Sequence, residues 1–442
     1  MPDKRCGPAR IHRTAPVFRT RTGGGVMKKY AAVSALVLFL VGCAVDPLDD
    51  LDPVSGDEGD GGNPEAIHAW VWAYTGGPDS LSVFHTIDKQ CWESFRVGFR
   101  PDNGFHPAGL VGGGIYPTLW TWSGEDVVSL TNGILDHGDH GHIVHPREHV
   151  AFSAGTGFTV AGMSVTPDGS RIVVCGTFPE EQTGETISIN CQTGDTVRYP
   201  AEYAVSYVVA GSDRMLTGNA NSVTGTILQT EDGAHVASIT TDTLVFGGVY
   251  HASTATVFLA GKTGIDVVDL QNGSIADAID YEGDGRVTVL LAAGGSDYAL
   301  GLCDAGDGSS GHVCVLDMKN RTLQRYSASG AQFAHDMDNG TVALSDDGST
   351  AILSDLKKSV LYRITPAEGA IEQTTAPDTA CPVACSHDGT RVWTLTRSKA
   401  FQVSFETNAI VDSIALPAGT TWIMVTSFRD NGALFDSNDH TF

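Results

Sequence analysis

The segment Pro167-Asp168-Gly169-Ser170-Arg171-Ile172-Val173-Val174 joins a tight turn to a short apolar strand, and this pattern returns along most of the chain. Aspartate, glycine and serine favour the turn, and the β-branched run that follows favours a buried strand. Similar turn signals recur about every 40 to 50 residues, which is the period of a four-stranded propeller blade. They lie at residues 167–170, 211–213, 252–254, 294–297, 346–349 and 387–390.

Further strands follow each of these turns. A second strand such as residues 264–270 is separated from a third by a polar turn, for example Thr193-Gly194-Asp195 or Asn272-Gly273, which is typical of hairpin links. Long helical periodicity is absent, and 52 glycines suit many tight turns. Residues 64–442 are therefore predicted to form one all-β domain, a β-propeller with blades of four antiparallel strands.

The two ends of this domain are predicted to complete one blade together. Three strands come from the front, at residues 69–74, 81–87 and 92–97, and one comes from the back, at residues 422–428. Such closure leaves no open sheet edge. Together with seven repeat centres this predicts eight blades, with seven as the alternative. The centres lie near residues 116, 168, 213, 254, 296, 347 and 388.

The first 42 residues predict export. A short basic start at Met27-Lys28-Lys29 precedes an apolar run at residues 31–41, which is too short to span a bilayer. The run ends in Leu40-Val41-Gly42-Cys43 and resembles the bacterial lipoprotein signal, which implies that Cys43 is lipidated and becomes the first mature residue. Residues 1–26 are interpreted as a translation start placed too early. A genuine long leader or an ordinary cleaved signal peptide is the alternative.

Residues 43–63 are predicted to form a lipidated, flexible, acidic tether, because they contain too few apolar side chains to offset the entropy of ordering. The leader holds 8 of the 27 basic and 1 of the 52 acidic residues, so the chain from Cys43 onward carries a formal net charge of −32. This charge repels phosphate and excludes nucleic acid as a partner, so contact with a membrane is expected only through the lipid.

The cysteines also suit an oxidising compartment outside the cytoplasm. Three pairs are close enough in the sequence to form disulfides across neighbouring strands or a short loop. They are Cys175 with Cys191, Cys303 with Cys314, and Cys381 with Cys385. A thiolate zinc site at the last pair is the alternative.

A histidine-rich segment carries the strongest chemical signal. Five of the 15 histidines lie between residues 137 and 149, together with an aspartate at 139. Imidazole and carboxylate groups suit zinc, and also divalent copper or nickel. Glycines at 138 and 141 and a proline at 146 disfavour a helix, so a flexible loop is expected. Three or four of the following residues are predicted to bind Zn(II): His137, Asp139, His140, His142, His145 and His149.

The run Asp136-His137-Gly138-Asp139-His140, with His149 on a following strand, resembles the AztD-type periplasmic zinc metallochaperones. The resemblance implies a secreted β-propeller that transfers zinc to the solute-binding protein of a zinc ABC importer. This chain departs from the family in its expected lipid anchor. It also lacks the family's His-Gly-Glu segment in the later blades, so the resemblance implies no second metal site.

The predicted function is therefore that of a monomeric zinc metallochaperone, lipid-anchored in the bacterial cell envelope. We expect no enzyme, because the sequence contains no Gly-x-Ser-x-Gly, His-Glu-x-x-His or P-loop motif. The first alternative is a surface-anchored propeller that binds a protein or glycan without metal transfer. His335-Asp336 and His387-Asp388, at turns before inner strands, are candidate further metal ligands, with ordinary turn or core histidines as the alternative. A propeller hydrolase with a metal in the central channel is a further alternative, for which the sequence offers no motif.

Overall fold

In the computed structural model the chain divides into two units, Met1–Val54 and Ser55–Phe442, and every residue that the structure describes belongs to the second. The predicted leader, Cys43 and the predicted tether therefore lie outside the described residues, as does the C-terminal stretch 430–442. The described residues are 67–75, 80–86, 89–96, 106–108, 118–123, 126–131, 134–136, 141–143, 148–168, 170–190, 193–281, 286–292, 296–304, 312–328, 330–333, 341–345, 348–385, 389, 391–396 and 398–429.

All regular elements of the described residues are β-strands. Two four-stranded sheets combine strands that are separated in sequence: β34 (Thr420–Arg429) with β1 (Ile67–Thr75), β2 (Ser80–His85) and β3 (Cys91–Arg96), and β4 (His106–Ala108), β5 (Thr118–Ser123) and β6 (Asp126–Thr131) with β9 (Glu148–Ser153). Between β6 and β9, the strands β7 (Ile134–Asp136) and β8 (Gly141–Ile143) form a separate two-stranded sheet.

Six further sheets each contain four consecutive strands. They are β10 (Thr159–Val165), β11 (Arg171–Phe178), β12 (Thr183–Asn190) and β13 (Thr196–Ala201); β14 (Tyr207–Ala210), β15 (Arg214–Gly218), β16 (Thr224–Gln229) and β17 (His235–Thr240); β18 (Val245–His251), β19 (Thr256–Gly261), β20 (Gly264–Asp269) and β21 (Ser274–Asp280); β22 (Arg286–Leu291), β23 (Tyr298–Asp304), β24 (His312–Asp317) and β25 (Thr322–Ser327); β26 (Val342–Leu344), β27 (Ala351–Ser354), β28 (Val360–Thr365) and β29 (Ala370–Thr375); and β30 (Val383–Cys385), β31 (Val392–Thr396), β32 (Lys399–Ser404) and β33 (Ala409–Ala415).

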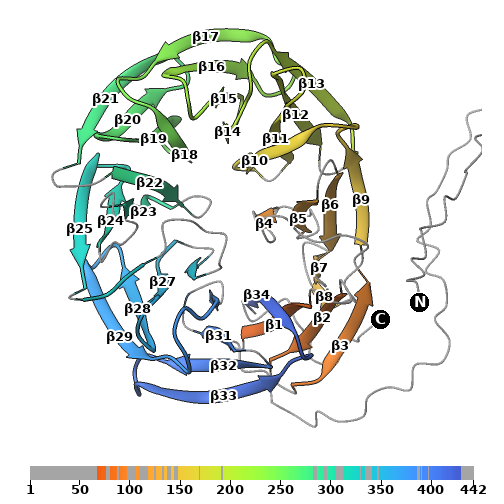
Figure 1. The fold of residues 1–442 in the computed structure, drawn as a ribbon, viewed down its shortest axis with the longest axis vertical. Coiled ribbons are helices and arrows are strands. Elements are labelled where there is room, and N and C mark those ends of the chain that lie inside the picture. Colours follow the sequence, from red (N-terminus) through yellow and green to blue (C-terminus); the bar gives the residue numbers. More distant parts are fainter. Residues whose placement is uncertain are drawn as a thin grey trace, which may run out of the picture. The chain divides into compact units, whose positions relative to one another are not determined.

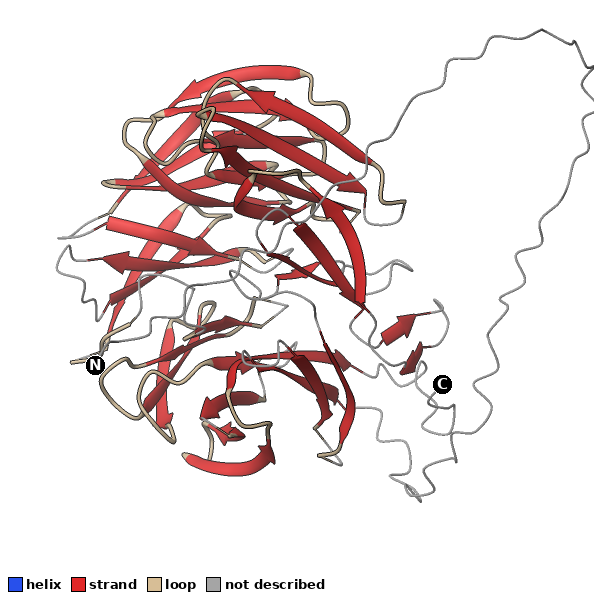
Figure 2. Cartoon of the chain, turned by 45° about the vertical axis from the view of Figure 1, so that its right-hand side comes forward, coloured by secondary structure: helices blue, strands red, loops and turns tan. Residues whose placement is uncertain are grey.

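The sheets are arranged as the blades of a β-propeller (Figure 1). The first strands of successive sheets contact one another, as β10 does with β14, β14 with β18, and β18 with β22. The fourth strands, such as β17 and β21, lie on the outer side (Figure 1). Figure 2 shows the same strands without a helix among the described residues. The predicted all-β propeller with four-stranded antiparallel blades is thus confirmed, and the total number of blades stays a prediction.

The predicted pairing between strands from the two ends of the propeller domain is also confirmed. β34 pairs antiparallel with β1 along its length, with Ile67 opposite Arg429 and Tyr74 opposite Trp422. The strand order β3-β2-β1-β34 makes the C-terminal strand the first of this sheet. Backbone pairing between the two ends therefore replaces two unpaired strand edges with one continuous ladder.

Burial decreases from the inside of a blade to its outside, and the sequence explains why. β19 (Thr256–Gly261) is buried at every position, whereas β21 (Ser274–Asp280) is exposed at nearly every position. Three of the seven residues of β21 are serine or aspartate, whereas β19 contains neither. The turn before it is formed as predicted: the Asp269 carboxylate accepts a hydrogen bond from the Asn272 backbone at 2.9 Å, and Gly273 adopts a φ of 67°. A left-handed φ suits glycine, which has no Cβ.

The hydrophobic core lies between successive sheets. Phe258 is fully buried with Val249 of its own sheet and with Val287 and Leu290 of the next. Burying a side chain of this size contributes roughly 1.5–3 kcal/mol. Equivalent apolar clusters lie between the other neighbouring pairs of sheets whose side chains are described. Each blade therefore depends on its neighbours for its core, and this keeps the ends of the strands in fixed positions.

No helix in the described residues is both long and apolar enough to cross a membrane.

Candidate functional site

The histidine-rich segment coincides with an insertion between the third and fourth strands of one blade. β6 and β9 pair directly, with Ser129 opposite His149. The chain between them forms the β7–β8 hairpin, in which Leu135 pairs with His142 and Asp136 pairs with Gly141. A purely flexible loop was expected here, but the apolar residues Ile134 and Ile143 pair at the far end of the hairpin. The insertion thus contains a short ladder.

The structure places the six predicted ligands unequally. His149 lies on β9 and His142 on β8. His137, Asp139 and His140 belong to residues 137–140, which join β7 to β8, and together with His145 they lie outside the described residues. Paired residues of an antiparallel ladder are about 4.5–5.5 Å apart at Cα, so Asp136 and Gly141 bring both ends of that four-residue connection together. The predicted set of zinc ligands remains a prediction.

The described side chains contain no ready-made alternative metal site. Among them, no group of three or more His, Cys, Asp or Glu is placed to hold a metal ion. The further candidates His335-Asp336 and His387-Asp388 lie outside the described residues. The histidine-rich insertion therefore remains the candidate metal centre.

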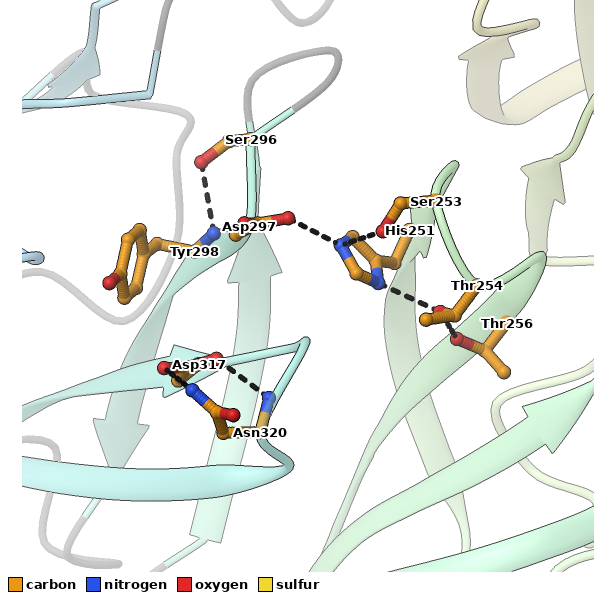
Figure 3. A network of polar contacts seen from close by, with 9 residues as sticks. All are labelled: His251, Ser253, Thr254, Thr256, Ser296, Asp297, Tyr298, Asp317 and Asn320. Atoms are coloured by element: carbon orange, nitrogen blue, oxygen red, sulfur yellow. Dashed lines mark hydrogen bonds and ion pairs between the residues drawn. The ribbon is translucent and has the colours of Figure 1, made fainter.

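A buried histidine outside this insertion forms a polar network between neighbouring sheets (Figure 3). His251, at the end of β18, is 2% exposed. Its Nδ1 lies 2.8 Å from Thr254 Oγ1, and its Nε2 lies 2.9 Å from Asp297 Oδ1 and 3.0 Å from Ser253 Oγ. Asp297 immediately precedes β23 of the next sheet, and its hydrogen bond with His251 lowers the pKa of this carboxyl. Because both ring nitrogens already have protein partners, His251 serves packing between blades and not metal binding.

The same network has the residue types of a hydrolase triad without its geometry. Ser253 and Asp297 both face Nε2 of His251, whereas a catalytic triad places the serine and the carboxylate on opposite nitrogens. The hydroxyl on the other nitrogen, that of Thr254, is also hydrogen-bonded to Thr256. This arrangement supports the turn and presents no activated serine.

A polar hollow of about 490 Å³ lies on the described surface between β11, β15 and the turn after β20. Arg171 and Arg214 line it, and their charges would suit an anion. However, Arg214 Nη1 donates hydrogen bonds to the carbonyls of Leu270 at 2.7 Å and Gln271 at 2.6 Å. Arg171 Nε donates to Ser188 Oγ at 2.7 Å. Both guanidinium groups are therefore engaged with the protein, and the hollow is a weak candidate for ligand binding.

The cysteines of the predicted pairs occupy different environments. The Sγ atoms of Cys303 and Cys314 lie 2.8 Å apart. Cys175 is a buried thiol whose pKa is raised by desolvation, and its predicted partner Cys191 lies outside the described residues. Cys381 donates a hydrogen bond from Sγ to the Asp378 carbonyl at 3.2 Å. The three disulfides thus stay predictions, with the pair Cys303 and Cys314 the best placed.

Comparison with known proteins finds similar solved structures but no match in sequence. No family model and no curated protein matches the sequence. Two structures of AztD from Citrobacter koseri match with TM-scores of 0.60 and 0.61 at 12% and 14% identity, and each match covers 82% of this chain and 99% of the AztD chain. Dihydro-heme d1 dehydrogenase NirN in complex with DHE matches with a TM-score of 0.57 at 11% identity, covering 82% of this chain and 75% of its own.

These likenesses establish the fold. The resemblance to AztD-type proteins, first seen in the histidine-rich segment, extends to the propeller that carries it. A dehydrogenase shares the same fold, so the architecture alone does not assign an activity. The residues inserted into the blade must carry the functional argument.

Proposed function

We propose that this protein is a zinc-binding metallochaperone of the bacterial cell envelope. In this proposal it holds Zn(II) in the histidine-rich insertion and transfers the ion to the solute-binding protein of a zinc ABC importer. It carries out no catalysis. It acts as a monomer attached to the membrane through lipid on Cys43, and residues 43–63 serve as the tether.

One observation carries the proposal. All six candidate ligands belong to the insertion after β6 or to the strand β9 that ends it. His149 lies on a strand that is paired within a packed blade, and His142 lies on a short two-stranded ladder. The similarity in fold to AztD supports the same assignment.

The expected mechanism follows from the different positions of the candidate ligands, one on a strand of the blade and the others in the inserted segment. The blade fixes the backbone of one ligand, and the inserted segment supplies the others. Zinc takes about four ligands, and the segment offers more donors than that, so one donor can leave the ion while another remains. Stepwise exchange of this kind lets an acceptor protein replace the ligands one at a time, without release of free zinc.

Zinc content and affinity test the binding step. The protein is purified without a histidine tag and compared with the triple variant His137→Ala, His140→Ala, His142→Ala. The matched control is His235→Ala, which removes an exposed imidazole from the outer strand β17. We expect about one tightly held zinc in the wild type and in the control, in line with a single site, and loss of tight binding in the triple variant.

Transfer is tested separately with the zinc-free solute-binding protein. The zinc-loaded protein is mixed with it in the presence of a competing chelator, and the two proteins are separated before the metal is measured. Direct transfer delivers zinc that the chelator does not capture. Equal zinc affinity in the wild type and the triple variant would refute the binding site. If the wild type binds zinc tightly but does not transfer it under protection from the chelator, the protein would be a metal-binding envelope protein and no chaperone. If it shows neither tight binding nor transfer, the alternative of a surface-anchored interaction protein would be favoured.

A further inference from the structure

Two buried cysteines meet across neighbouring strands, far from the histidine-rich insertion in sequence. Cys303 lies on β23 and Cys314 on β24. The register places Gly301 opposite Cys314, so Cys303, two positions along β23, lies diagonally across on the same face of the sheet. Their Sγ atoms are 2.8 Å apart, and the residues are 3% and 0% exposed.

We propose that Cys303 and Cys314 form a disulfide that links β23 to β24 in the exported protein. A disulfide has an S–S distance of about 2.05 Å, so the sulfurs need to approach by only about 0.75 Å. The register puts both side chains on the same face of the sheet, and rotation about their Cα–Cβ bonds changes the separation of the two sulfurs. The inference is independent of zinc binding.

A shared metal ion explains the pair less well. A structural zinc site requires four ligands, whereas only two thiols meet here. No group of three or more His, Cys, Asp or Glu in the described part of the chain is placed to hold a metal. The surroundings instead suit a buried link, because Cys303 and Cys314 belong to one hydrophobic cluster together with Tyr281.

The reaction is a thiol–disulfide exchange with a disulfide oxidant, either an oxidised thiol–disulfide oxidoreductase or a small-molecule disulfide. The thiolate of one cysteine attacks the S–S bond of the oxidant, which forms a mixed disulfide and releases one oxidant thiol. The second cysteine displaces the other oxidant sulfur and completes the protein disulfide. Two electrons and two protons pass from the cysteines to the oxidant, which leaves as two thiols.

Burial determines when this exchange takes place. Because both sulfurs are shielded once β23 and β24 have paired, the oxidant reaches them while the chain folds after export. The finished disulfide is shielded from reductant in the same way. We therefore expect it to resist reductant in the folded protein and to be reduced readily after unfolding.

The test uses the full chain, expressed with its own leader and isolated from the cell envelope. The protein is unfolded and alkylated without reductant, then digested with trypsin, which leaves both cysteines in one peptide, residues 287–319. A second digestion before Asp304 and Asp307 cuts the chain between the cysteines. We expect nearly all of this region as two fragments that remain joined until reductant is added.

Variants make the assignment specific. In Cys303→Ser, the fragment with Cys314 should be released and alkylated, and Cys314→Ser should give the reciprocal result. Wild-type protein that is unfolded, reduced and refolded with thiol present provides the unlinked reference. Alkylation of both cysteines in the exported wild type would overturn the proposal. So would a link from either cysteine to a third one, or a link that forms only after a strong chemical oxidant is added.

Discussion

Two glycines with the same backbone conformation should respond very differently to the same substitution. Gly233 and Gly194 both lie in turns between the third and fourth strands of a blade, with φ values of 70° and 74°. A Cβ added at Gly194 would meet no atom within 4 Å. A Cβ added at Gly233 would lie 1.9 Å from Cδ1 of Tyr199. An alanine adds the same backbone strain at both positions, so the difference between the two variants reports the contact with Tyr199.

The expected magnitudes follow from these contacts. A left-handed conformation costs a residue with a Cβ roughly 1–2 kcal/mol, and this term is common to both variants. At Gly233 the ring of Tyr199 must also move away, although it is 7% exposed and its hydroxyl donates a hydrogen bond to the Thr230 carbonyl at 3.1 Å. Overpacking of this kind costs about 1–3 kcal/mol, and loss of the hydrogen bond adds about 1 kcal/mol. Gly233→Ala should therefore destabilise the protein by about 2–4 kcal/mol more than Gly194→Ala.

Denaturant unfolding of both variants measures this difference as a change in the free energy of unfolding. A double-mutant cycle identifies its cause: in a Tyr199→Ala background, Gly233→Ala should cost no more than Gly194→Ala does in the wild type. Equal costs for the two single variants, or an unchanged cost of Gly233→Ala in the Tyr199→Ala background, would refute the assigned contact.

Three further predictions concern the core, the polar network and the metal. Phe258→Ala should reduce the free energy of unfolding by about 3–5 kcal/mol, whereas Val411→Ala on an outer strand, where the side chain is 53% exposed, should change it by less than about 0.5 kcal/mol; similar values would contradict the packing between sheets. His251→Leu should lower the unfolding midpoint at neutral pH. The hydrogen bond with His251 lowers the pKa of the Asp297 carboxyl in the folded protein, so the stabilisation from this pair is present above the pKa of an unfolded aspartate, about 3.9, and is lost as the pH falls through the lower folded value. The difference in stability between the wild type and the variant should therefore narrow in acid, as measured by unfolding at a series of pH values. Zinc affinity, measured by chelator competition, should fall as the pH drops below about 6.5, since histidines must be neutral to bind; affinity that does not change between pH 7 and 5 would exclude an imidazole site.

The parts of the fold that depend on local chemistry could be predicted from the sequence. Turn residues followed by β-branched runs located strands such as β11, and leftover strands at both ends indicated that β34 completes the sheet of β1. The His251 network could not be predicted in this way, because Asp297 is 46 residues distant in sequence. Its one local signal was the turn Ala252-Ser253-Thr254, which supplies two of the hydroxyls on the imidazole.

The histidine-rich segment could be found from its composition, but the β7–β8 hairpin that carries part of it could not. Glycines within it suggested a loop without regular structure, whereas Ile134 and Ile143 close a hairpin around it. The sequence offered three cysteine pairs, and the register of β23 and β24 shows how one of them, Cys303 and Cys314, comes together in the described part of the chain. Pairing registers depend on contacts between distant segments, so they are not encoded in the spacing of residue types alone.

The placement of the insertion within the blade bears directly on metal transfer. A ligand on β9 is held by the ladder with β6, and that blade packs on the next through Val127, which is fully buried in the cluster with Ile172. If His149 is a zinc ligand as proposed, its backbone moves little, and it would define where the ion is kept. In the proposed function, the donors of the inserted segment between β6 and β9 are the ones that exchange with those of an acceptor, because loops between strands carry less packing than the strands themselves. His149→Ala should therefore weaken zinc retention more than His145→Ala, which also removes one imidazole of the segment, and equal retention in the two variants would show that the strand position gives His149 no special part in the proposed site.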